Sequence, residues 1–257
     1  MKNQWRRITV WVYGALPLIL FFAAWYLLTS GSERRTFFFG SPYLYVVSFL
    51  NGILTGSLLK DTLVTGSEAV IGFLIGNVTG AVAGFMLWKS PRTSRALRPY
   101  IILLGSAPLF AFAPIIIIWF GTGFFAKVVV AVLSTVFVAL MQAFNGAEQA
   151  DPTLAELIRS FGGNENVVFR KVVIPSSLVW VIAGFRLNVG LALLGAFLGE
   201  YISSEAGLGH LILVAGGLYN IPRVLVGVTM IGFLGLMLSW AVGVLGRDLR
   251  KRLVSTL

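Results

Sequence analysis

The side chains that could carry out chemistry are few in this sequence. Its 257 residues include no cysteine, one histidine, His210, and ten acidic residues. The chain therefore has no thiol nucleophile, thiolate metal site or disulfide, and one histidine cannot form a multi-histidine cluster. The acidic residues lie in polar connections or near the ends of long apolar runs, and none form a pair inside such a run. An enzyme that works inside a membrane has little to use here.

The sequence also lacks the GxxxxGK[ST] loop that cradles nucleotide phosphates. We therefore expect no ATP hydrolysis and no bound cofactor or metal on this chain. A secondary transporter driven by an ion gradient often has inverted repeats and carboxylates at the membrane midplane, and neither is visible here. That class stays open as a less favoured alternative.

The composition is that of an integral membrane protein. Hydrophobic residues make up 57% of the chain and charged residues 12%, whereas a soluble domain carries about 25% charged residues. The net charge of +10 does not indicate nucleic-acid binding in such a chain, because Lys and Arg in membrane proteins mark the cytoplasmic side. No internal repeat or low-complexity linker divides the sequence, so we predict a single all-α membrane domain over residues 1–257.

Six apolar runs are long enough to cross the bilayer as helices, which takes about 20 residues each. The predicted spans cover roughly residues 10–28, 62–87, 99–120, 124–145, 177–199 and 222–246. The first run follows "MKNQWRR" and is long for the apolar region of a signal peptide. Because further spans follow it, we predict a retained helix.

Positive charges sort to one side of these spans. That side holds Lys2, Arg6, Arg7, Lys89, Arg92, Arg95, Arg98, Arg159, Arg170, Lys171, Arg247, Arg250, Lys251 and Arg252. The other side holds Arg34, Arg35, Lys60, Lys127 and Arg223. The positive-inside rule then places both termini in the cytoplasm.

The segment 41–59, "SPYLYVVSFLNGILTGSLL", is almost long enough to span and leaves an alternative open. Counting it as a span would invert the N-terminus, and the charge rule barely separates the two topologies. Ser41 and Pro42 are typical of a helix cap and a first-turn proline, and polar residues interrupt the apolar pattern. We therefore predict a helix over about 42–60 that lies at the outer membrane surface.

Small residues and prolines mark two of the spans. The second span carries glycines at intervals of four residues: Gly72, Gly76, Gly80 and Gly84. They form one bare ridge on which another helix can pack closely. In the third span, Pro108 and Pro114 remove backbone hydrogen bonds and predict kinks, which are tolerated where protein or a water-filled cavity surrounds them. This span is a candidate wall of a pathway, and a kink needed only for packing is an equal alternative.

Charged residues within or beside the spans are few, and three of them are candidates for a role there. Arg186 lies about two turns into the fifth span and is expected to face the bundle interior, where a carboxylate, a carbonyl or an anionic solute can meet it. Glu68 and Glu200 lie near the outer ends of their spans, where water can solvate them. In the loop 201–221, the Gly-rich "AGLG" allows a re-entrant turn near the outer end of a pathway, and an ordinary turn fits the same residues.

The polar stretch 151–175, "DPTLAELIRSFGGNENVVFRKVVIP", interrupts the apolar sequence between the fourth and fifth spans. Asp151 and Pro152 are a typical cap and first residue of a helix. An apolar stripe follows at helical spacing: Leu154, Leu157, Ile158 and Phe161. A Gly-Gly pair ends this helix, Asn164 caps a second helix, and Pro175 opens the fifth span. Because about ten residues are too few for a stable isolated helix, the stripe packs either on its own bundle or in a groove of another protein.

This stretch resembles a known motif. Glu156, Gly162 and the run 172–175 match the spacing of the "EAA" motif of binding-protein-dependent ABC importer permeases. That motif reads Glu-Ala-Ala, three residues, Gly, nine residues, then Ile-x-Leu-Pro. Here Leu157 and Ile158 replace the alanines, and the departures within 172–175 also exchange one apolar residue for another.

Two further segments are similar to the nitrate/sulfonate/taurine branch of these permeases. They are "SAPLFAFAPIIIIWFGTG" (106–123) and "AGFRLNVGLALLGAFLGEYISSEAGLGHLI" (183–212). The resemblance covers roughly residues 60–250. It implies a type I importer permease fold with six transmembrane helices and a cytoplasmic coupling helix between the fourth and fifth spans, in the inner membrane of a bacterium.

The resemblance also implies partners and residue roles. Two permease subunits, either two copies or a pair with a paralogue, would assemble with a cytoplasmic ABC ATPase dimer that binds ATP and Mg²⁺, and with an external solute-binding protein. Residues 153–163 would be the coupling helix, which docks in the ATPase and drives alternating access. The coupling contacts would involve Leu154, Glu156, Leu157, Ile158, Phe161, Gly162 and Pro175. The pathway or gate would involve Pro108, Pro114, Arg186, Glu200, Gly207 and Gly209.

The solute is the least defined part of this prediction. The branch that the sequence resembles implies a small anion such as nitrate, taurine or an alkanesulfonate. Related branches carry aromatic carboxylates, riboflavin or pyrimidine vitamin precursors, and in these systems the binding protein chooses the solute.

Overall fold

The computed structural model describes residues 16–17 and 19–255, with side chains described as far as Asp248. Every regular element within these residues is a helix, in agreement with the predicted all-α fold. The beginning of the predicted first span, 10–28, lies outside the described residues. Its remainder belongs to a short apolar helix, Ile19–Thr29.

The remaining elements follow one another along the chain with short connections. They are α2 (Glu33–Phe39), α3 (Pro42–Leu54), α4 (Ser57–Lys89), α5 (Pro91–Ser106), the 3₁₀ turn η1 (Leu109–Phe112), α6 (Ala113–Phe120), α7 (Phe124–Glu148), α8 (Pro152–Ser160), α9 (Glu165–Val168), the π-helical turn η2 (Phe169–Val173), α10 (Ile174–Ile202), α11 (Leu208–Gly217) and α12 (Ile221–Ser255).

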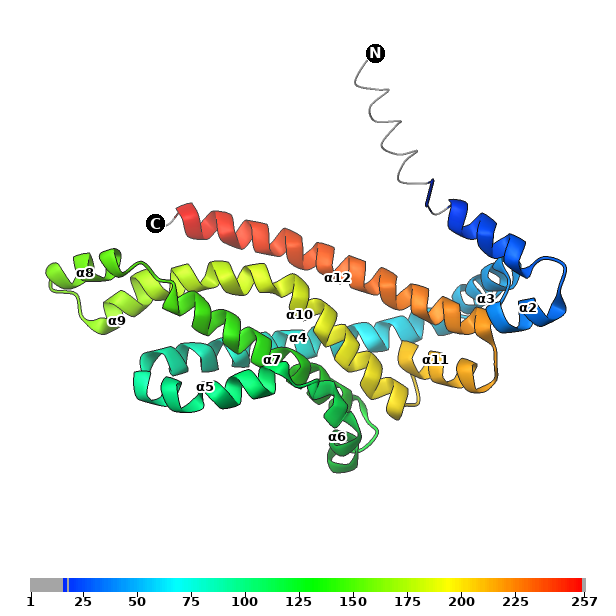
Figure 1. The fold of residues 1–257 in the computed structure, drawn as a ribbon, viewed down its shortest axis with the longest axis horizontal. Coiled ribbons are helices and arrows are strands. Elements are labelled where there is room, and N and C mark those ends of the chain that lie inside the picture. Colours follow the sequence, from blue (N-terminus) through cyan, green and yellow to red (C-terminus); the bar gives the residue numbers. More distant parts are fainter. Residues whose placement is uncertain (1–15, 18, 256–257) are drawn as a thin grey trace, which may run out of the picture.

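Four long helices, α4, α7, α10 and α12, run along the longest dimension of the molecule (Figure 1). Each is long and apolar enough to cross a membrane, α10 together with the α9–η2 segment that precedes it. The predicted spans 62–87, 124–145, 177–199 and 222–246 lie within these four helices. Up to six spans result if the bent pairs α2–α3 and α5–α6 each count as one.

The predicted third span, 99–120, is broken into two parts. α5 and the η1–α6 segment meet at an angle of 79°, and the break lies at Pro108, which precedes η1. Pro114 lies in the first turn of α6, where the N–H that proline lacks would have no partner within the helix. The sequence therefore predicted the break correctly at Pro108 but not at Pro114, which starts a helix instead of bending one.

The segment that follows α2 begins as predicted and ends early. Ser41 Oγ accepts a hydrogen bond from Leu44 N at 3.2 Å, and Pro42 is the first residue of α3. The helix ends at Leu54, not near residue 60, because Gly56 turns the chain with a φ of 71° and α4 starts at Ser57. Since α2 and α3 together also qualify as a span bent by 46°, the surface location of α3 stays a prediction.

The glycine ridge of α4 packs against α7. Its glycines face small residues of α7 in the pairs Gly72–Ala131, Gly76–Thr135, Gly80–Ala139 and Gly84–Ala143. A Cβ built on Gly80 would lie 2.8 Å from the Cβ of Ala139, closer than two carbon atoms can approach without displacement. The two backbones are therefore as close as their atoms allow, and α4 and α7 form the most extensive contact between helices.

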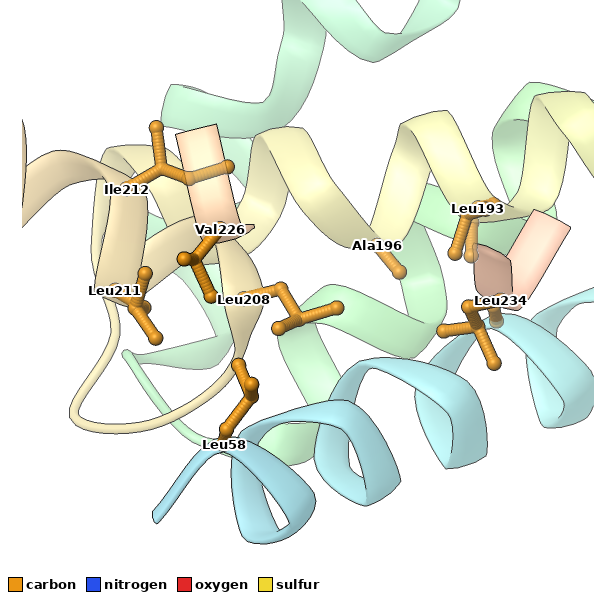
Figure 2. Close-up of a cluster of buried hydrophobic side chains, with 10 residues drawn as sticks. Leu58, Leu193, Ala196, Leu208, Leu211, Ile212, Val226 and Leu234 are labelled. Atoms are coloured by element: carbon orange, nitrogen blue, oxygen red, sulfur yellow. The ribbon is translucent and has the colours of Figure 1, made fainter. Parts of the chain in front are cut away.

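A buried apolar cluster lies where α4, α10, α11 and α12 meet (Figure 2). Figure 2 labels most of its members, Leu58, Leu193, Ala196, Leu208, Leu211, Ile212, Val226 and Leu234. Leu208 and Leu58 are almost completely buried. This cluster holds the short helix α11 against the end of the bundle that is opposite α8 (Figure 1).

Replacing Gly80 with alanine tests the contact between α4 and α7. We expect Gly80→Ala to lower the free energy of unfolding by about 1–3 kcal/mol, the usual cost of overpacking, because the new methyl group presses on Ala139 and on the carbonyl of Val136. Gly190→Ala in α10 is the matched control, since no atom lies within 4 Å of a Cβ there. Thermal unfolding in detergent, followed by circular dichroism, measures both. Equal midpoints for the two variants would contradict a tight ridge.

Candidate functional site

The polar stretch between α7 and α10 forms two short helices at one end of the bundle (Figure 1). Asp151 caps α8, and its Oδ1 accepts a hydrogen bond from Thr153 N at 2.8 Å. Asn164 caps α9, and its Oδ1 accepts one from Val167 N at 3.1 Å. Side chains of this type satisfy backbone N–H groups that have no partner in the first helical turn. Both predicted caps are confirmed.

α8 ends in a tight hydrogen-bonded turn. The N–H of Gly162 donates to the carbonyl of Arg159, and the N–H of Gly163 donates to the carbonyl of Ile158, both at 2.9 Å. This pair of bonds is the Schellman arrangement that closes many helices. Gly162 has a φ of 82°, which glycine adopts without steric cost. The turn fixes the direction in which the chain leaves α8.

An exposed ion pair bridges this turn. Arg159 Nε lies 2.7 Å from Glu165 Oε1, and its Nη2 lies 3.2 Å from Oε2. The hydrogen bond to Glu165 raises the pKa of the Arg159 guanidinium, so this side chain stays charged. Exposed pairs contribute little to stability, but a two-point contact of this geometry is directional. It orients α8 relative to the start of α9.

The apolar stripe of α8, formed by Leu154, Leu157, Ile158 and Phe161, faces away from the rest of the chain. Leu154 is 49% exposed, Leu157 50% and Phe161 84%, while Ile158 is half-buried and lies against Gly163. The stripe is therefore not packed on its own bundle, which was one of the two sequence-based alternatives. Glu156 is also exposed.

Pro175 lies in the first turn of α10, as predicted, and the π-helical turn η2 precedes it. Proline has no N–H and clashes with the carbonyl one turn before it. A wider π turn accommodates such a local mismatch. The helical stretch then continues from Glu165 to Ile202, and it joins the α8 region directly to the far end of α10.

At that far end, Glu200 lies in a buried polar cluster. We call Asp61, Thr65, Glu68, Lys127 and Glu200 the carboxylate cluster. Thr65 Oγ1 lies 2.7 Å and 2.9 Å from the two carboxylate oxygens of Glu200. Glu68 is 2% exposed and Glu200 is fully buried. The expectation that water solvates these two glutamates is wrong, because α4, α7, α10 and α11 close around them.

The carboxylate cluster holds the beginning of α11. Gly207 N donates to Asp61 Oδ1 at 3.0 Å, Leu208 N to Thr65 Oγ1 at 2.9 Å, and Gly209 N to Glu200 Oε2 at 2.7 Å. The unpaired N–H groups of a helix start favour anionic partners. Gly207 has a φ of 107°, and a Cβ there would overlap the Glu200 carboxylate. The structure thus brings together three predicted site residues, Glu200, Gly207 and Gly209.

Lys127 is the basic member of the cluster. It is 2% exposed, its Nζ donates to the carbonyl of Thr122, and it lies near Glu68 and Glu200. The absence of a side chain at Gly199 makes room for it, since a Cβ there would lie 3.0 Å from Lys127 Cγ. The direct polar partner of Lys127 among the described residues is the Thr122 carbonyl, and a buried polar group needs such a partner.

Sequence reasoning missed most of this cluster, although a signal was present. Thr65 and Glu68 precede Gly72 by seven and four residues, so they continue the face that carries the glycine ridge. Lys127 precedes Ala131, a partner of that ridge, by four residues. One face of α4 therefore carries both the glycines that contact the α7 backbone and, toward the start of the helix, the polar residues of the cluster.

A second buried polar contact crosses the middle of the bundle. Asn188 Nδ2 of α10 donates to Asn77 Oδ1 of α4 at 2.6 Å and lies 3.4 Å from Gln142 Oε1 of α7. Asn188 is fully buried. This contact also went unpredicted, and it ties together the three helices that form the centre of the fold.

Arg186 does not join either polar contact. It was expected to face the bundle interior, but it is exposed and lines a groove between α10 and α12. The face of α10 that carries Asn188 and Val189 is the buried one, and Arg186 points instead toward Gly243 of α12. The structure therefore separates Arg186 from Glu200, which sequence reasoning had grouped in one pathway.

Comparison with known proteins places this geometry in context. Residues 76–251 match the family described as binding-protein-dependent transport system inner membrane component. The chain is 28% identical to the putative aliphatic sulfonates transport permease protein SsuC of Bacillus subtilis, over 97% of this chain and 91% of that protein. It is 31% identical to the riboflavin transport system permease protein RibX of Chloroflexus aurantiacus, over 92% of this chain and 89% of that protein.

The fold is also similar to a solved structure. A chain of the MetNI methionine ABC transporter, in an inward-facing conformation, superposes with a TM-score of 0.67 at 17% identity. The match covers 76% of this chain and 97% of that one. The predicted all-α importer-permease fold is confirmed.

Removing the hydroxyl of Thr65 tests whether the carboxylate cluster holds α11. We expect Thr65→Val to cost about 1.5–3 kcal/mol, as for hydrogen bonds to charged groups, and to speed hydrogen exchange at the amides of Leu208 and Gly209. Thr79→Val is the matched control on the same helix, because the Thr79 hydroxyl bonds only to carbonyls of α4. Hydrogen exchange with mass spectrometry over residues 203–212 gives the readout. Unchanged exchange in Thr65→Val would exclude this role.

Proposed function

The chain belongs to the family of binding-protein-dependent transport system inner membrane components, and we propose that α8 couples it to the ATPase subunits of an ATP-driven importer. The chain is a multi-pass permease of the ABC importer type in the inner membrane. Family membership implies an ATPase and a solute-binding protein as partners. These two partners act at opposite ends of the bundle, because the ATPase is cytoplasmic and the solute-binding protein is external.

The observation that carries the proposal is the exposed apolar stripe of α8. Leu157 and Phe161 are half or more exposed at the tip of the bundle, where the neighbouring sequence is rich in Arg and Lys and where water surrounds the helix. An apolar stripe on a short, firmly capped helix fits the helix-in-groove mode of recognition. The groove belongs to the ATPase, and residues 153–163 form the coupling helix.

The ATP chemistry then lies on the partner, since the sequence of this chain has no phosphate-binding loop. ATP binding closes the ATPase dimer and moves the two coupling helices together, and the pathway opens toward the docked binding protein. Hydrolysis resets it. ATP and Mg²⁺ are held by the ATPase dimer, and a second copy of this chain or a paralogue completes the pathway.

The charge distribution supports an orientation for this machine. Arg and Lys are concentrated in the α4–α5 connection, from α8 to η2 and near the end of α12, and these segments lie at the α8 end of the bundle (Figure 1). By the positive-inside rule, this end and both termini face the cytoplasm. The opposite end, with α3, α11 and the carboxylate cluster, faces the binding protein. There Glu200, Gly207 and Gly209 form a gate, and the broken third span, with Pro108 and Pro114, lines the pathway.

We favour a small anion of the nitrate, sulfonate or taurine class as the solute. The similarity to an aliphatic sulfonates permease protein over almost the full length supports it. The riboflavin permease protein is similar over nearly the same length, so riboflavin, an aromatic carboxylate or a pyrimidine vitamin precursor is the second candidate. The binding protein selects the solute in either case.

Purification of the chain from its native membrane in mild detergent, with mass spectrometry of the associated proteins, tests the assembly. We expect an ATPase with a phosphate-binding loop and a solute-binding protein to co-purify. The binding protein can then be titrated with taurine, an alkanesulfonate, nitrate and riboflavin. Repeated purification without any ATPase, with none captured by crosslinking before extraction, would contradict the coupling role.

A charge placed on the α8 stripe should disrupt the docking. We expect Leu157→Asp to weaken ATPase association at least about tenfold, as for an anchor residue in an interface groove, and to abolish uptake. Ser160→Asp carries the same charge on the same helix but lies off the stripe, and it should leave association intact. The amount of ATPase recovered with each tagged variant is the measurement. Equal recovery from both variants would show that the stripe is not the docking surface.

A further inference from the structure

Two arginines line one groove on the outer surface of the bundle. Arg186 of α10 and Arg247 of α12 both line a cavity of about 260 Å³ between these helices, which lie side by side in Figure 1. Both side chains are exposed. Apart from the arginines, the walls are apolar or bare, with Ile182 on α10 and Gly243 and Gly246 on α12.

Gly243 makes room for the Arg186 guanidinium, and Gly246 makes room for Ile182. A Cβ built on Gly243 would lie 3.0 Å from Arg186 Nη2, and one built on Gly246 would lie 2.9 Å from Ile182 Cγ2. These contacts also give the register of the two antiparallel helices. Arg186 is level with Gly243, about one turn before Arg247, where the apolar sequence of α12 ends. The groove therefore lies at the level of the membrane boundary on the α8 side.

Within the described side chains, neither arginine has an ionic partner. The ion pair found among them joins Arg159 to Glu165, and no hydrogen bond from Arg186 or Arg247 is present. The sequence outside the described side chains, 1–15, 18 and 249–257, contains no Asp or Glu. At the membrane boundary, these charges are compensated by water or by an anion from outside the chain.

The surroundings indicate where such an anion comes from. Leu187, Trp240 and Leu245 lie within three residues of the groove's lining residues in the sequence and are 59%, 72% and 57% exposed, as expected of a surface that faces lipid. The polar contacts of the bundle interior, through Asn188 and Glu200, lie on another face of α10. An anion that reaches Arg186 therefore arrives from the bilayer side.

We propose that this groove binds the phosphate of an anionic phospholipid from the leaflet on the α8 side. The two guanidiniums bind the phosphate, since arginine matches phosphate oxygens with paired N–H donors. The groove between α10 and α12 admits the headgroup, and the acyl chains follow the apolar surface of these two helices. Basic pockets between membrane helices bind headgroups by this chemistry. The site requires only that the chain spans a membrane, not that α8 binds an ATPase.

The test measures which lipid stays with the protein. The full chain, with its co-purifying subunits, is reconstituted with equal phosphatidylcholine and phosphatidylglycerol, then extracted into detergent and stripped stepwise while native mass spectrometry counts the retained lipids. We expect retention of phosphatidylglycerol over phosphatidylcholine. Arg186→Gln and Arg247→Gln should each reduce this retention about fivefold.

Matched variants separate the site from general effects. Arg223→Gln removes the same charge at the other end of α12 and should leave retention unchanged, while Arg186→Lys keeps the charge and should retain more phosphatidylglycerol than Arg186→Gln. Circular dichroism of each variant confirms that it is folded. Equal retention by the parent chain, Arg186→Gln and Arg247→Gln would overturn the proposal.

Two further outcomes would overturn it in favour of another anion. Binding of taurine or inorganic phosphate by the parent chain but not by Arg186→Gln, without selective retention of phosphatidylglycerol, would mean that the arginines bind a free solute anion. Because the chain has no cysteine, Ala183→Cys at the edge of the groove provides a single reactive thiol. Efficient disulfide formation between two copies at this position would mean that a second permease chain covers the groove and supplies the charge.

Discussion

Inside a bilayer, the hydrophobic effect does not drive helices together, because the lipid tails are as apolar as the side chains. The packing of α4 against α7 therefore depends on the close approach of their backbones. Four glycines on α4 remove the side chains that would keep the helices apart, and small residues of α7 fill the resulting surface. α10 packs against both helices, and α12 and α11 pack against α10. The α4–α7 pair is therefore the central contact of the bundle, and the remaining helices pack around it.

The two ends of this bundle differ in which groups they expose and which they bury. At one end, α8 leaves an apolar stripe exposed, and caps, a closing turn and an ion pair hold the helix that presents it. At the other end, charged groups are buried, and the carboxylates of Asp61 and Glu200 bind the backbone at the start of α11. Each arrangement costs free energy in an isolated subunit, and each is held by contacts whose geometry is specific.

Local features were predictable from the sequence because they depend on a few neighbouring residues. The caps Asp151 and Asn164, the stripe spacing on α8 and the glycine ridge all result from helical periodicity and from backbone groups that need a partner. The carboxylate cluster was not predictable in the same way. Its members come from α4, α7 and α10, and their burial depends on how these helices close around one another.

The side of α10 on which Arg186 lies could not be read from the sequence either. α10 is apolar around its whole circumference, so the hydrophobic pattern does not say which face is buried. Similarly, Pro114 looked like a kink because the sequence alone did not show that the chain had already turned at Pro108. In both cases the missing information was the position of a neighbouring segment.

The uninterrupted helix from Glu165 to Ile202 has a mechanical consequence. Its 38 residues form a helix about 55 Å long. α8 precedes one end of this helix, and Glu200 lies near the other. A closed turn and a two-point ion pair, not a flexible loop, connect α8 to this helix. A tilt of α8 is therefore passed on to the start of the helix. The π turn before Pro175 is the irregular turn along it, and beyond that turn α10 continues as one helix to the end where Glu200 lies.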